Sequence, residues 1–258
     1  MGRRLGQHFL KGAWAARALA RAAEISEEDT VLEIGPGKGA LTRELLLTGA
    51  RIIALEKDAS LVELLREKFA DEIAAGKLTV ISDDVREVLP KTLGLESGKY
   101  IVAANIPYYI TGEILRQFLT AESQPKRMAL LVQKEVAQRI ISKRESILSL
   151  SVKAYGVPEI AAKVPRGNFS PPPSVDSAII VIDGISRGFF DTIAEKGFFD
   201  IVRAGFSSKR KLLAGNLATH GHDKSRVLQA FFHCNIPEKA RAENVPLTLW
   251  KCLYRELL

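Results

Sequence analysis

Asn105, Ile106, Pro107 and Tyr108 could together grip a planar, amino-bearing molecule, and Tyr109 adds a second ring beside them. They directly follow Tyr100–Ala104, an apolar run of strand length. The amide oxygen of Asn105 and the Ile106 carbonyl could accept hydrogen bonds from an exocyclic NH2 group such as that of adenine, while an aromatic face stacks on the ring. From these residues alone, a polar turn with an aromatic lid is an equally good interpretation.

A second group of residues forms a glycine-rich turn of the kind that binds nucleotides. Gly35-Pro36-Gly37-Lys38-Gly39 follows a strand-like run, and 21 residues after Gly35 the next such run ends at Glu56. Glycines let the backbone approach a ligand, and a carboxylate at this point can accept hydrogen bonds from ribose hydroxyls. However, the spacing is G-x-G-x-G, and Pro36 lacks the amide hydrogen that a pyrophosphate would need. The pattern therefore favours S-adenosylmethionine over NAD.

Two further strand-like runs end in polar residues, at Asp83-Asp84 and at Asn105. In an open α/β sheet, ligands bind at the carboxyl ends of parallel strands. The glycine turn, Glu56, Asp83 and Asn105 would therefore meet at one edge of the sheet. The order of these four features along the chain is much more specific than any one of them alone. The Asp83 carboxylate is suited to the adenine amino group of the cofactor.

The elements that must position these residues alternate between strand-like and helix-like segments, which predicts a parallel, doubly wound α/β sheet. Strands are expected at 30–34, 51–55, 77–81, 100–104 and 127–132, and helices at 13–23, 40–47, 59–75, 112–119 and 134–142. Two strand-like runs without an intervening helix follow, at 156–164 and 177–182, and indicate an antiparallel edge pair.

The last quarter of the chain shows only helical periodicity, at 189–206, 211–220, 224–234 and 248–258. Gly184 and Gly188 interrupt the pattern before it. We therefore expect two domains, a catalytic domain at 1–185 and a helical domain at 186–258.

The net charge of +7 is concentrated at the two ends of the chain. Residues 1–21 carry +5 and residues 183–258 carry +4, which leaves −2 for the middle. This distribution suits a polyanionic partner, although charge on exposed helices that only maintains solubility would look similar.

Cys234 and Cys252 are the only cysteines, and their spacing predicts neither a disulfide framework nor a zinc module, as in a reducing cytoplasm. No apolar run reaches the length of a membrane span, and residues 1–10 lack the apolar core of a secretory signal.

These segments together resemble the small-subunit ribosomal RNA adenine N6,N6-dimethyltransferases of the kasugamycin-resistance type. The resemblance covers nearly the whole chain and keeps the order of that family. It implies a Rossmann-like class I methyltransferase domain followed by a small all-helical domain. The segments that carry it are GQHFL at 6–10, EIGPGKGALT at 33–42, NIPYYI at 105–110, QKEVAQRI at 133–140, FSPPPSVDSA at 169–178 and FSSKRKLLAGNL at 206–217.

The resemblance implies an activity: the transfer of methyl groups from S-adenosylmethionine to N6 of two adjacent adenosines in the 3′-terminal hairpin loop of 16S rRNA. The partner would be 16S rRNA within immature 30S subunits, and we expect a cytoplasmic monomer. Catalytic roles fall on Asn105, Ile106, Pro107, Tyr108 and Phe169, with Tyr108 and Phe169 on opposite faces of the target base. Cofactor binding falls on Gln7, His8, Leu10, Gly35, Gly37, Glu56, Lys57, Asp83, Asp84 and Asn105. RNA phosphates would contact Arg3, Arg4, Lys209, Arg210 and Lys211, and no metal is expected.

Three residues depart from the usual pattern of the family. His8 stands where asparagine is common, so its hydrogen bond could depend on pH. Asp84 stands where a small residue is usual, and its carboxylate could simply be solvated. Tyr109 replaces an asparagine and could alter the grip on the base. Two other functions stay open: a 23S rRNA methyltransferase of the macrolide-resistance type, and a non-catalytic RNA-binding assembly factor.

Overall fold

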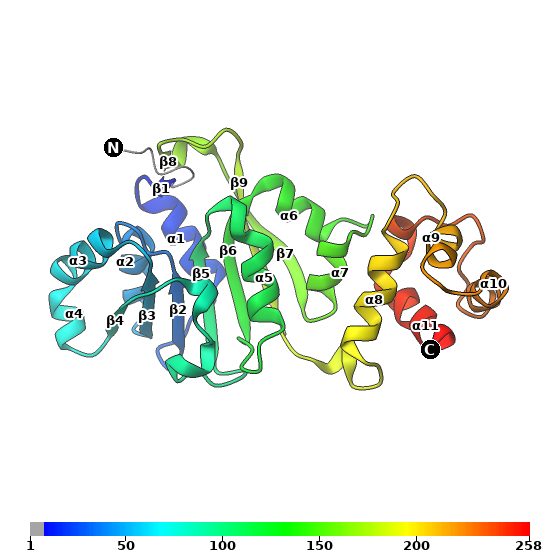
Figure 1. The fold of residues 1–258 in the computed structure, drawn as a ribbon. Coiled ribbons are helices and arrows are strands. Elements are labelled where there is room, and N and C mark those ends of the chain that lie inside the picture. Colours follow the sequence, from blue (N-terminus) through cyan, green and yellow to red (C-terminus); the bar gives the residue numbers. More distant parts are fainter. Residues whose placement is uncertain (1–7) are drawn as a thin grey trace. The chain divides into compact units, whose positions relative to one another are not determined.

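The computed structural model describes residues 8–258, and its main feature is a seven-stranded sheet with the order β4-β3-β2-β5-β6-β9-β7 (Figure 1). The expected α/β fold is confirmed. The strands are β2 (Thr30–Ile34), β3 (Arg51–Glu56), β4 (Leu78–Ser82), β5 (Tyr100–Asn105), β6 (Arg127–Gln133), β7 (Val157–Val164) and β9 (Ser177–Asp183).

Strands β4, β3, β2, β5 and β6 are parallel, so their carboxyl ends lie at one edge of the sheet. Strand β9 runs antiparallel between β6 and β7, which confirms the antiparallel pair at the end of the sheet. The register pairs Ile34 with both Leu55 and Ala104. The residues that come next along the chain, Gly35, Glu56 and Asn105, are thereby brought together.

The apolar faces of helices cover the sheet, so its central strands are buried on both faces, as is typical of a parallel sheet. Buried side chains of α1, α2 and α3 join those of the strands in one core. The expected helix at 59–75 is divided at Phe69, whose buried ring packs beside Gly39. The helices of this part are α1 (Ala13–Ala22), α2 (Ala40–Leu46), α3 (Ala59–Lys68), α4 (Ala70–Ala74), α5 (Thr111–Leu119) and α6 (Lys134–Ile141).

A separate two-stranded sheet joins the amino-terminal segment to the proline-rich corner. Strand β1 (Phe9–Leu10) pairs antiparallel with β8 (Phe169–Ser170), and the Lys11 amide donates to the Asn168 carbonyl at 2.6 Å. These contacts span about 160 residues of sequence and give residues 8–10 a fixed path.

The chain divides into two compact units, residues 1–137 with 156–186, and residues 138–155 with 187–258. The expected domains differ for 138–155, which they assign to the catalytic domain. Helix α7 (Ile147–Lys153), which the periodicity does not predict, explains the difference: Leu150 is part of the second core, and the Glu145 amide donates to the Glu243 carbonyl.

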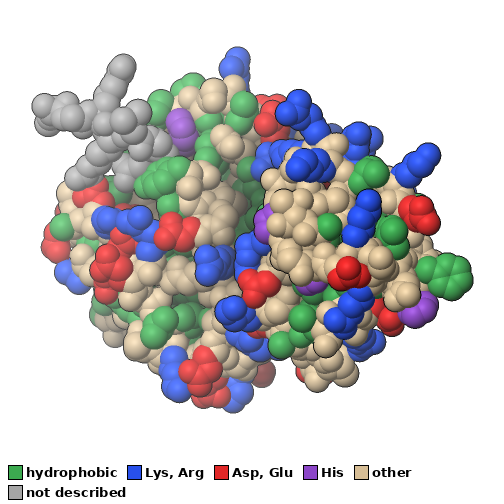
Figure 2. Space-filling view, turned by 45° about the vertical axis from the view of Figure 1, so that its right-hand side comes forward, with side chains coloured by type: hydrophobic (Ala, Val, Ile, Leu, Met, Phe, Trp, Pro, Cys, Tyr) green, Lys and Arg blue, Asp and Glu red, His purple; other side chains and the backbone are tan. Residues whose placement is uncertain are grey.

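The second unit is entirely helical in its carboxyl-terminal part, as expected, and buries Trp250 completely. Its helices are α8 (Glu195–Gly205), α9 (Leu213–Thr219), α10 (Lys224–His233) and α11 (Leu247–Leu257). Figure 2 shows lysine and arginine side chains gathered on the surface of this unit. Among residues 8–258, no helix is both long and apolar enough to cross a bilayer.

The two cysteines form a disulfide, which the sequence does not predict. Cys234 ends α10, and Cys252 lies on α11, with their Cα atoms 5.8 Å apart. The expectation from the spacing was therefore wrong on this point. Eighteen residues of separation say nothing about proximity, whereas the packing of α10 on α11 brings the two side chains together.

Candidate functional site

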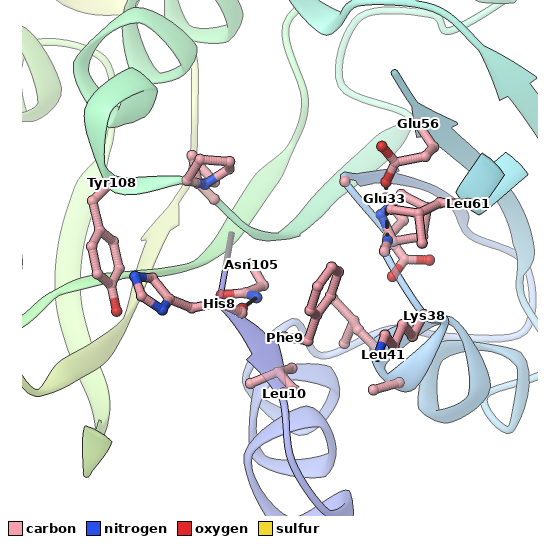
Figure 3. A pocket seen from close by; sticks show the side chains of 16 residues that line it. His8, Phe9, Leu10, Glu33, Lys38, Leu41, Glu56, Leu61, Asn105 and Tyr108 are labelled. Carbon is pink, nitrogen blue, oxygen red and sulfur yellow. Dashed lines mark hydrogen bonds between the residues drawn. The ribbon is translucent and has the colours of Figure 1, made fainter. Parts of the chain in front are cut away.

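A pocket opens at the carboxyl edge of the parallel strands, where the sequence places its candidate residues (Figure 3). In this view Glu33 and Glu56 lie on one side of the pocket, His8, Asn105 and Tyr108 lie on the other, and Phe9 stands between them. The lining residues are His8–Leu10, Glu33, Gly35–Lys38, Ala40, Leu41, Glu56, Leu61 and Asn105–Tyr108.

The glycine turn needs glycine for conformational and steric reasons. Gly35, Gly37 and Gly39 all have positive φ, at 65°, 57° and 75°. A Cβ atom on Gly37 would lie 3.0 Å from the ring of Phe9. The turn therefore allows β1 to cross closely above it, which a side chain at this position would prevent.

Glu56 is held in place by the backbone of both neighbouring turns. Its Oε2 accepts from the Gly37 amide at 3.1 Å, and its Oε1 accepts from the Asp58 amide at 2.9 Å. The side chain is buried in the pocket wall. These bonds fix the carboxylate at the end of β3, where it could bind ribose hydroxyls.

Asn105 is oriented by the backbone of the amino-terminal segment. Its Nδ2 donates to the His8 carbonyl at 3.0 Å, and since a carbonyl can only accept, the amide orientation follows. The Oδ1 atom has no protein partner among residues 8–258. The hydrogen bond to His8 therefore leaves Oδ1 of Asn105 as an acceptor in the pocket, which Ile106 also lines.

Tyr108 is anchored at its hydroxyl and covered on one face. Its hydroxyl lies 2.7 Å from the Ser177 Oγ, and burial raises the pKa of the phenol. The His8 ring stacks on it with centroids 5.7 Å apart and planes 29° apart. His8 in turn donates from Nδ1 to the Pro171 carbonyl at 2.8 Å, which ties the stacked pair to the proline-rich corner.

Glu33 is a pocket residue that the sequence analysis misses. It is fully buried, and neither carboxylate oxygen has a hydrogen-bond partner among the described residues. Burial raises the pKa of Glu33 to about 8, and the Glu56 charge adds to this effect. The Thr42 hydroxyl and amide are near enough to oppose it in part, but neither forms a hydrogen bond of normal geometry with the carboxyl. A buried carboxyl without a partner is costly, so it marks a place where a ligand cation would fit. The available signal was one carboxylate inside the otherwise largely apolar strand Thr30–Ile34.

Some candidate residues lie beside the pocket without lining it. Asp83 is exposed beyond the end of β4, and its Oδ1 accepts from the Asp84 amide at 2.7 Å. Asp84 is not simply solvated, because its Oδ2 is 2.6 Å from Lys57 Nζ and the Arg86 guanidinium binds both of its oxygens. These bonds hold the pKa of Asp84 well below its usual range, Arg86 contributing most.

Phe169 does not reach the pocket. It is only 2% exposed, pairs with Leu10 across the small sheet, and joins the core of the first unit. Its ring has no free face for a base in this structure. Gln7, Arg3 and Arg4 lie outside the described residues.

Lys209, Arg210 and Lys211 are all exposed in the turn between α8 and α9. No carboxylate pairs with them among residues 8–258. The buried Asn216 holds this turn from below, because its Nδ2 donates to the Gly205 and Ser208 carbonyls at 2.6 and 2.9 Å. The triplet is thus a fixed group of unneutralised cations. Residues 8–258 contain no group of His, Cys, Asp or Glu side chains suited to a metal ion.

Comparison with known proteins decides the family. A family model described as ribosomal RNA adenine dimethylase matches residues 2–257. The chain belongs to the ribosomal RNA adenine dimethylase family. Curated relatives of this dimethylase include a ribosomal RNA small subunit methyltransferase A from Dehalococcoides mccartyi, 39% identical over 96% of this chain and 86% of that protein. Another of the same name, from Moorella thermoacetica, is 36% identical over 98% of this chain and 91% of that protein.

Solved structures of two proteins resemble the dimethylase over nearly its whole length. A dimethyladenosine transferase from Plasmodium falciparum is 26% identical with a TM-score of 0.81, covering 95% of this chain and 96% of that one. The 23S rRNA methyltransferase ErmE is 27% identical with a TM-score of 0.79, covering 96% and 99%. The fold is therefore that of Rossmann-like methyltransferases.

Proposed function

We propose that this dimethylase transfers methyl groups from S-adenosylmethionine to N6 of two adjacent adenosines in the 3′-terminal hairpin loop of 16S rRNA. The observation that carries the proposal is the orientation of Asn105. Its amide donates to the His8 carbonyl, so Oδ1 is left as an acceptor beside the glycine turn. An acceptor is what an exocyclic amino group requires.

The carboxyl groups of the pocket suit the polar groups of S-adenosylmethionine. Glu33 offers an unpartnered carboxyl for the ammonium group of the methionine part, and Glu56 offers a fixed carboxylate for the ribose. Asp83 would accept from the amino group of the cofactor adenine. Bound there, the cofactor supplies an electrophilic methyl group.

The residues of the chain would act on the adenine amino group chiefly by position. The nitrogen lone pair is delocalised into the ring, which makes it a poor nucleophile. Asn105 Oδ1 and the Ile106 carbonyl would accept its two hydrogens and favour a pyramidal nitrogen. The free face of Tyr108 would stack on the base. Since Phe169 is buried, we leave it out of this arrangement.

RNA would be held through phosphates as well as through the target base. Lys209, Arg210 and Lys211 are exposed cations without carboxylate partners in the described part of the chain, which suits contacts of this kind. We propose 16S rRNA within immature 30S subunits as the substrate and a monomeric enzyme. A ribosomal substrate would place the enzyme in the cytoplasm.

Two observations favour the small-subunit substrate and a catalytic role. Curated relatives named for the small subunit are 33–40% identical to this chain, whereas the 23S rRNA enzyme ErmE is 27% identical. The glycine turn, Glu56 and Asn105 are all in place around one pocket, which a purely RNA-binding factor would not need.

The test is methylation of 16S rRNA in immature 30S particles, with free 16S and free 23S rRNA in parallel and the dimethyladenosines mapped. We expect modification of two adjacent adenosines in the small-subunit substrate. Asn105→Ala should lower methyl transfer by about 100-fold or more while binding of S-adenosylhomocysteine largely persists. Full transfer by this variant, or mapping to 23S rRNA alone, would overturn the proposal.

A further inference from the structure

Tyr109 and Tyr108 are consecutive residues of one short 3-10 turn, η3 (Tyr108–Ile110), yet their environments are opposite. Tyr108 forms a hydrogen bond with Ser177, and its ring stacks against His8. Tyr109 is 76% exposed and makes no hydrogen bond or ring contact within residues 8–258. Successive side chains of a 3-10 turn point about 120° apart, so one ring turns into the site and the next faces solvent. Tyr109 therefore does not serve packing.

A cluster of two cations on one carboxylate lies near this ring. Arg86 belongs to the turn η1 (Val85–Glu87), and its Nε and Nη2 bind both oxygens of Asp84, which also pairs with Lys57. The cluster carries a net charge of +1. The second terminal nitrogen of Arg86 has no hydrogen-bond partner within residues 8–258 and is available to another group. Asp84 thus fixes the direction of the guanidinium without using all of its donors.

Helix α5 supports both η1, which carries Arg86, and η3, which carries Tyr109. Gln117 of α5 donates from Nε2 to the Val85 and Val88 carbonyls at 2.6 and 2.9 Å, which fastens η1 to the helix that begins two residues after Tyr109. The pKa of Arg86 is raised above its usual value, first by Asp84 and more weakly by Glu113 and Tyr109. The turn that carries Arg86 and the turn that carries Tyr109 are therefore both attached to α5.

We propose that Tyr109 and Arg86 form a contact surface for the nucleotide next to the target adenosine, with a base stacked on Tyr109 and a phosphate on Arg86. The proposal rests on the proposed function and extends it beyond the base that reacts. Single-stranded RNA is bound by such pairs of exposed aromatic rings and cations.

The Tyr109 variants separate stacking from other roles. Tyr109→Ala should raise KM for the RNA about fivefold or more, because stacking on the ring is lost, with kcat changed less than about twofold. Tyr109→Phe should keep the wild-type KM, since the hydroxyl has no bond. A labelled 16S 3′-terminal hairpin oligonucleotide, titrated in the presence of S-adenosylhomocysteine, measures the affinity directly. The affinity of each variant for S-adenosylhomocysteine alone should equal that of the wild type.

The Arg86 variant tests the phosphate contact. Arg86→Gln should lower the slope of log affinity against log salt by about one, the value for one lost phosphate contact. Arg66→Gln is a matched control, because Arg66 on α3 is exposed and paired with Glu63 in the same unit. It should leave the slope unchanged.

Unchanged hairpin affinity and KM in Tyr109→Ala would overturn the inference while the proposed function stands. An equal loss in Tyr109→Phe would also overturn it, since the ring would not be the contact. Failure of the wild-type protein to methylate any rRNA would instead overturn the proposed function. The hairpin titration would still decide whether Tyr109 binds RNA.

Discussion

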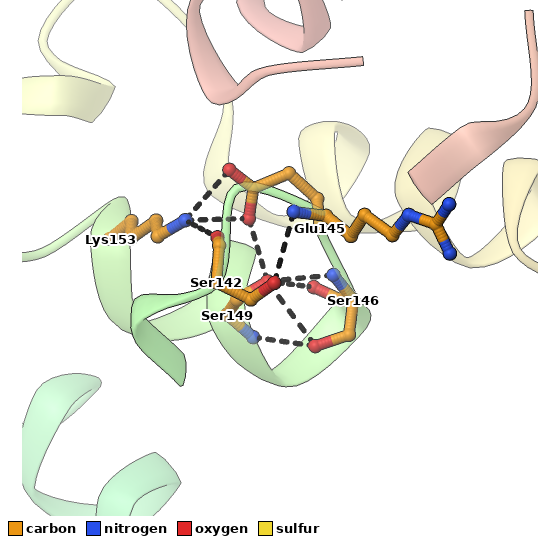
Figure 4. Close-up of polar contacts among 6 residues, drawn as sticks. Ser142, Glu145, Ser146, Ser149 and Lys153 are labelled. Atoms are coloured by element: carbon orange, nitrogen blue, oxygen red, sulfur yellow. Dashed lines mark hydrogen bonds and ion pairs between the residues drawn. The ribbon is translucent and has the colours of Figure 1, made fainter. Parts of the chain in front are cut away.

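Two buried carboxyl groups, Glu33 in the pocket and Glu145 in the helical unit, have opposite surroundings. Glu33 has no hydrogen-bond partner among the described residues. Glu145 is bound to Lys153 Nζ at 2.8 and 3.0 Å and accepts from the Ser149 Oγ at 2.7 Å (Figure 4). Lys153 also donates to the Ser142 carbonyl at 2.7 Å. Both groups are almost completely removed from water.

The difference separates a carboxyl group that stabilises the fold from one that we propose binds a ligand. Burying a carboxylate costs several kcal/mol unless partners replace its water, and around Glu145 they do. Around Glu33 the described residues supply no such partners, and burial raises the pKa to about 8. Partners built into the fold hold a structure together, whereas their absence in a pocket leaves the place for a cation brought by a ligand.

The largest expected effect is on stability, through Glu145. Glu145→Gln removes one charge from a buried pair and leaves Lys153 without its counterion, which should lower the free energy of unfolding by about 3 kcal/mol. Urea denaturation followed by circular dichroism measures this change. Glu33→Gln is the matched variant, because it removes an unpaired carboxyl of the same size. It should leave stability unchanged or raise it. A loss as large as that of Glu145→Gln would show that Glu33 is also compensated within the fold.

The second effect is on ligand binding, which we expect to depend on Glu33 and not on Glu145. Glu33→Gln should weaken binding of S-adenosylhomocysteine by about 10- to 100-fold, since a hydrogen bond between charged groups contributes about 1.5–3 kcal/mol. Calorimetric titration measures the affinity at pH 7.5. Glu145→Gln should bind as the wild type does. Equal affinity in both variants would show that Glu33 does not contact the ligand.

The sequence predicts the positions of the strand ends well and the state of individual side chains poorly. Asn105 and Glu56 lie in the pocket because strand register places the ends of parallel strands together. The need of Glu33 for a partner is not visible in the sequence, because it depends on what surrounds the side chain after folding. Phe169 is buried by pairing with Leu10, a contact between distant segments that local patterns do not contain. Cys234 and Cys252 meet for the same kind of reason.

The third effect is the pH dependence of stability and of ligand affinity that Glu33 causes. Its pKa is raised from 4.5 to about 8 in the folded protein, so the stability that it contributes is full below pH 4.5 and is lost as the pH rises through about 8. A bound ammonium group favours the ionised form. Binding of S-adenosylhomocysteine at pH 6.5 should therefore release about one proton, and affinity should rise by a little under tenfold from pH 6.5 to 7.5.

Proton release is measured by calorimetry at one pH in two buffers of different ionisation enthalpy. In Glu33→Gln the release should disappear and the affinity should become nearly independent of pH over this range. Proton release that persists unchanged in this variant would assign it to another group, such as the neighbouring Glu56.

The smallest effect tests how much the Ser149 hydroxyl, compared with Lys153, stabilises the buried carboxylate of Glu145. Ser149→Ala removes the hydroxyl that donates to Glu145 Oε2 and accepts from the Ser146 amide, but it leaves both bonds from Lys153. The free energy of unfolding should fall by about 1 kcal/mol, the usual net value of a buried hydrogen bond. Ser142→Ala is the control, because the Ser142 hydroxyl only accepts from the exposed Arg144 amide and its carbonyl, which binds Lys153, is kept. A loss in Ser149→Ala as large as that in Glu145→Gln would mean that the hydroxyl, rather than the lysine, compensates the buried charge.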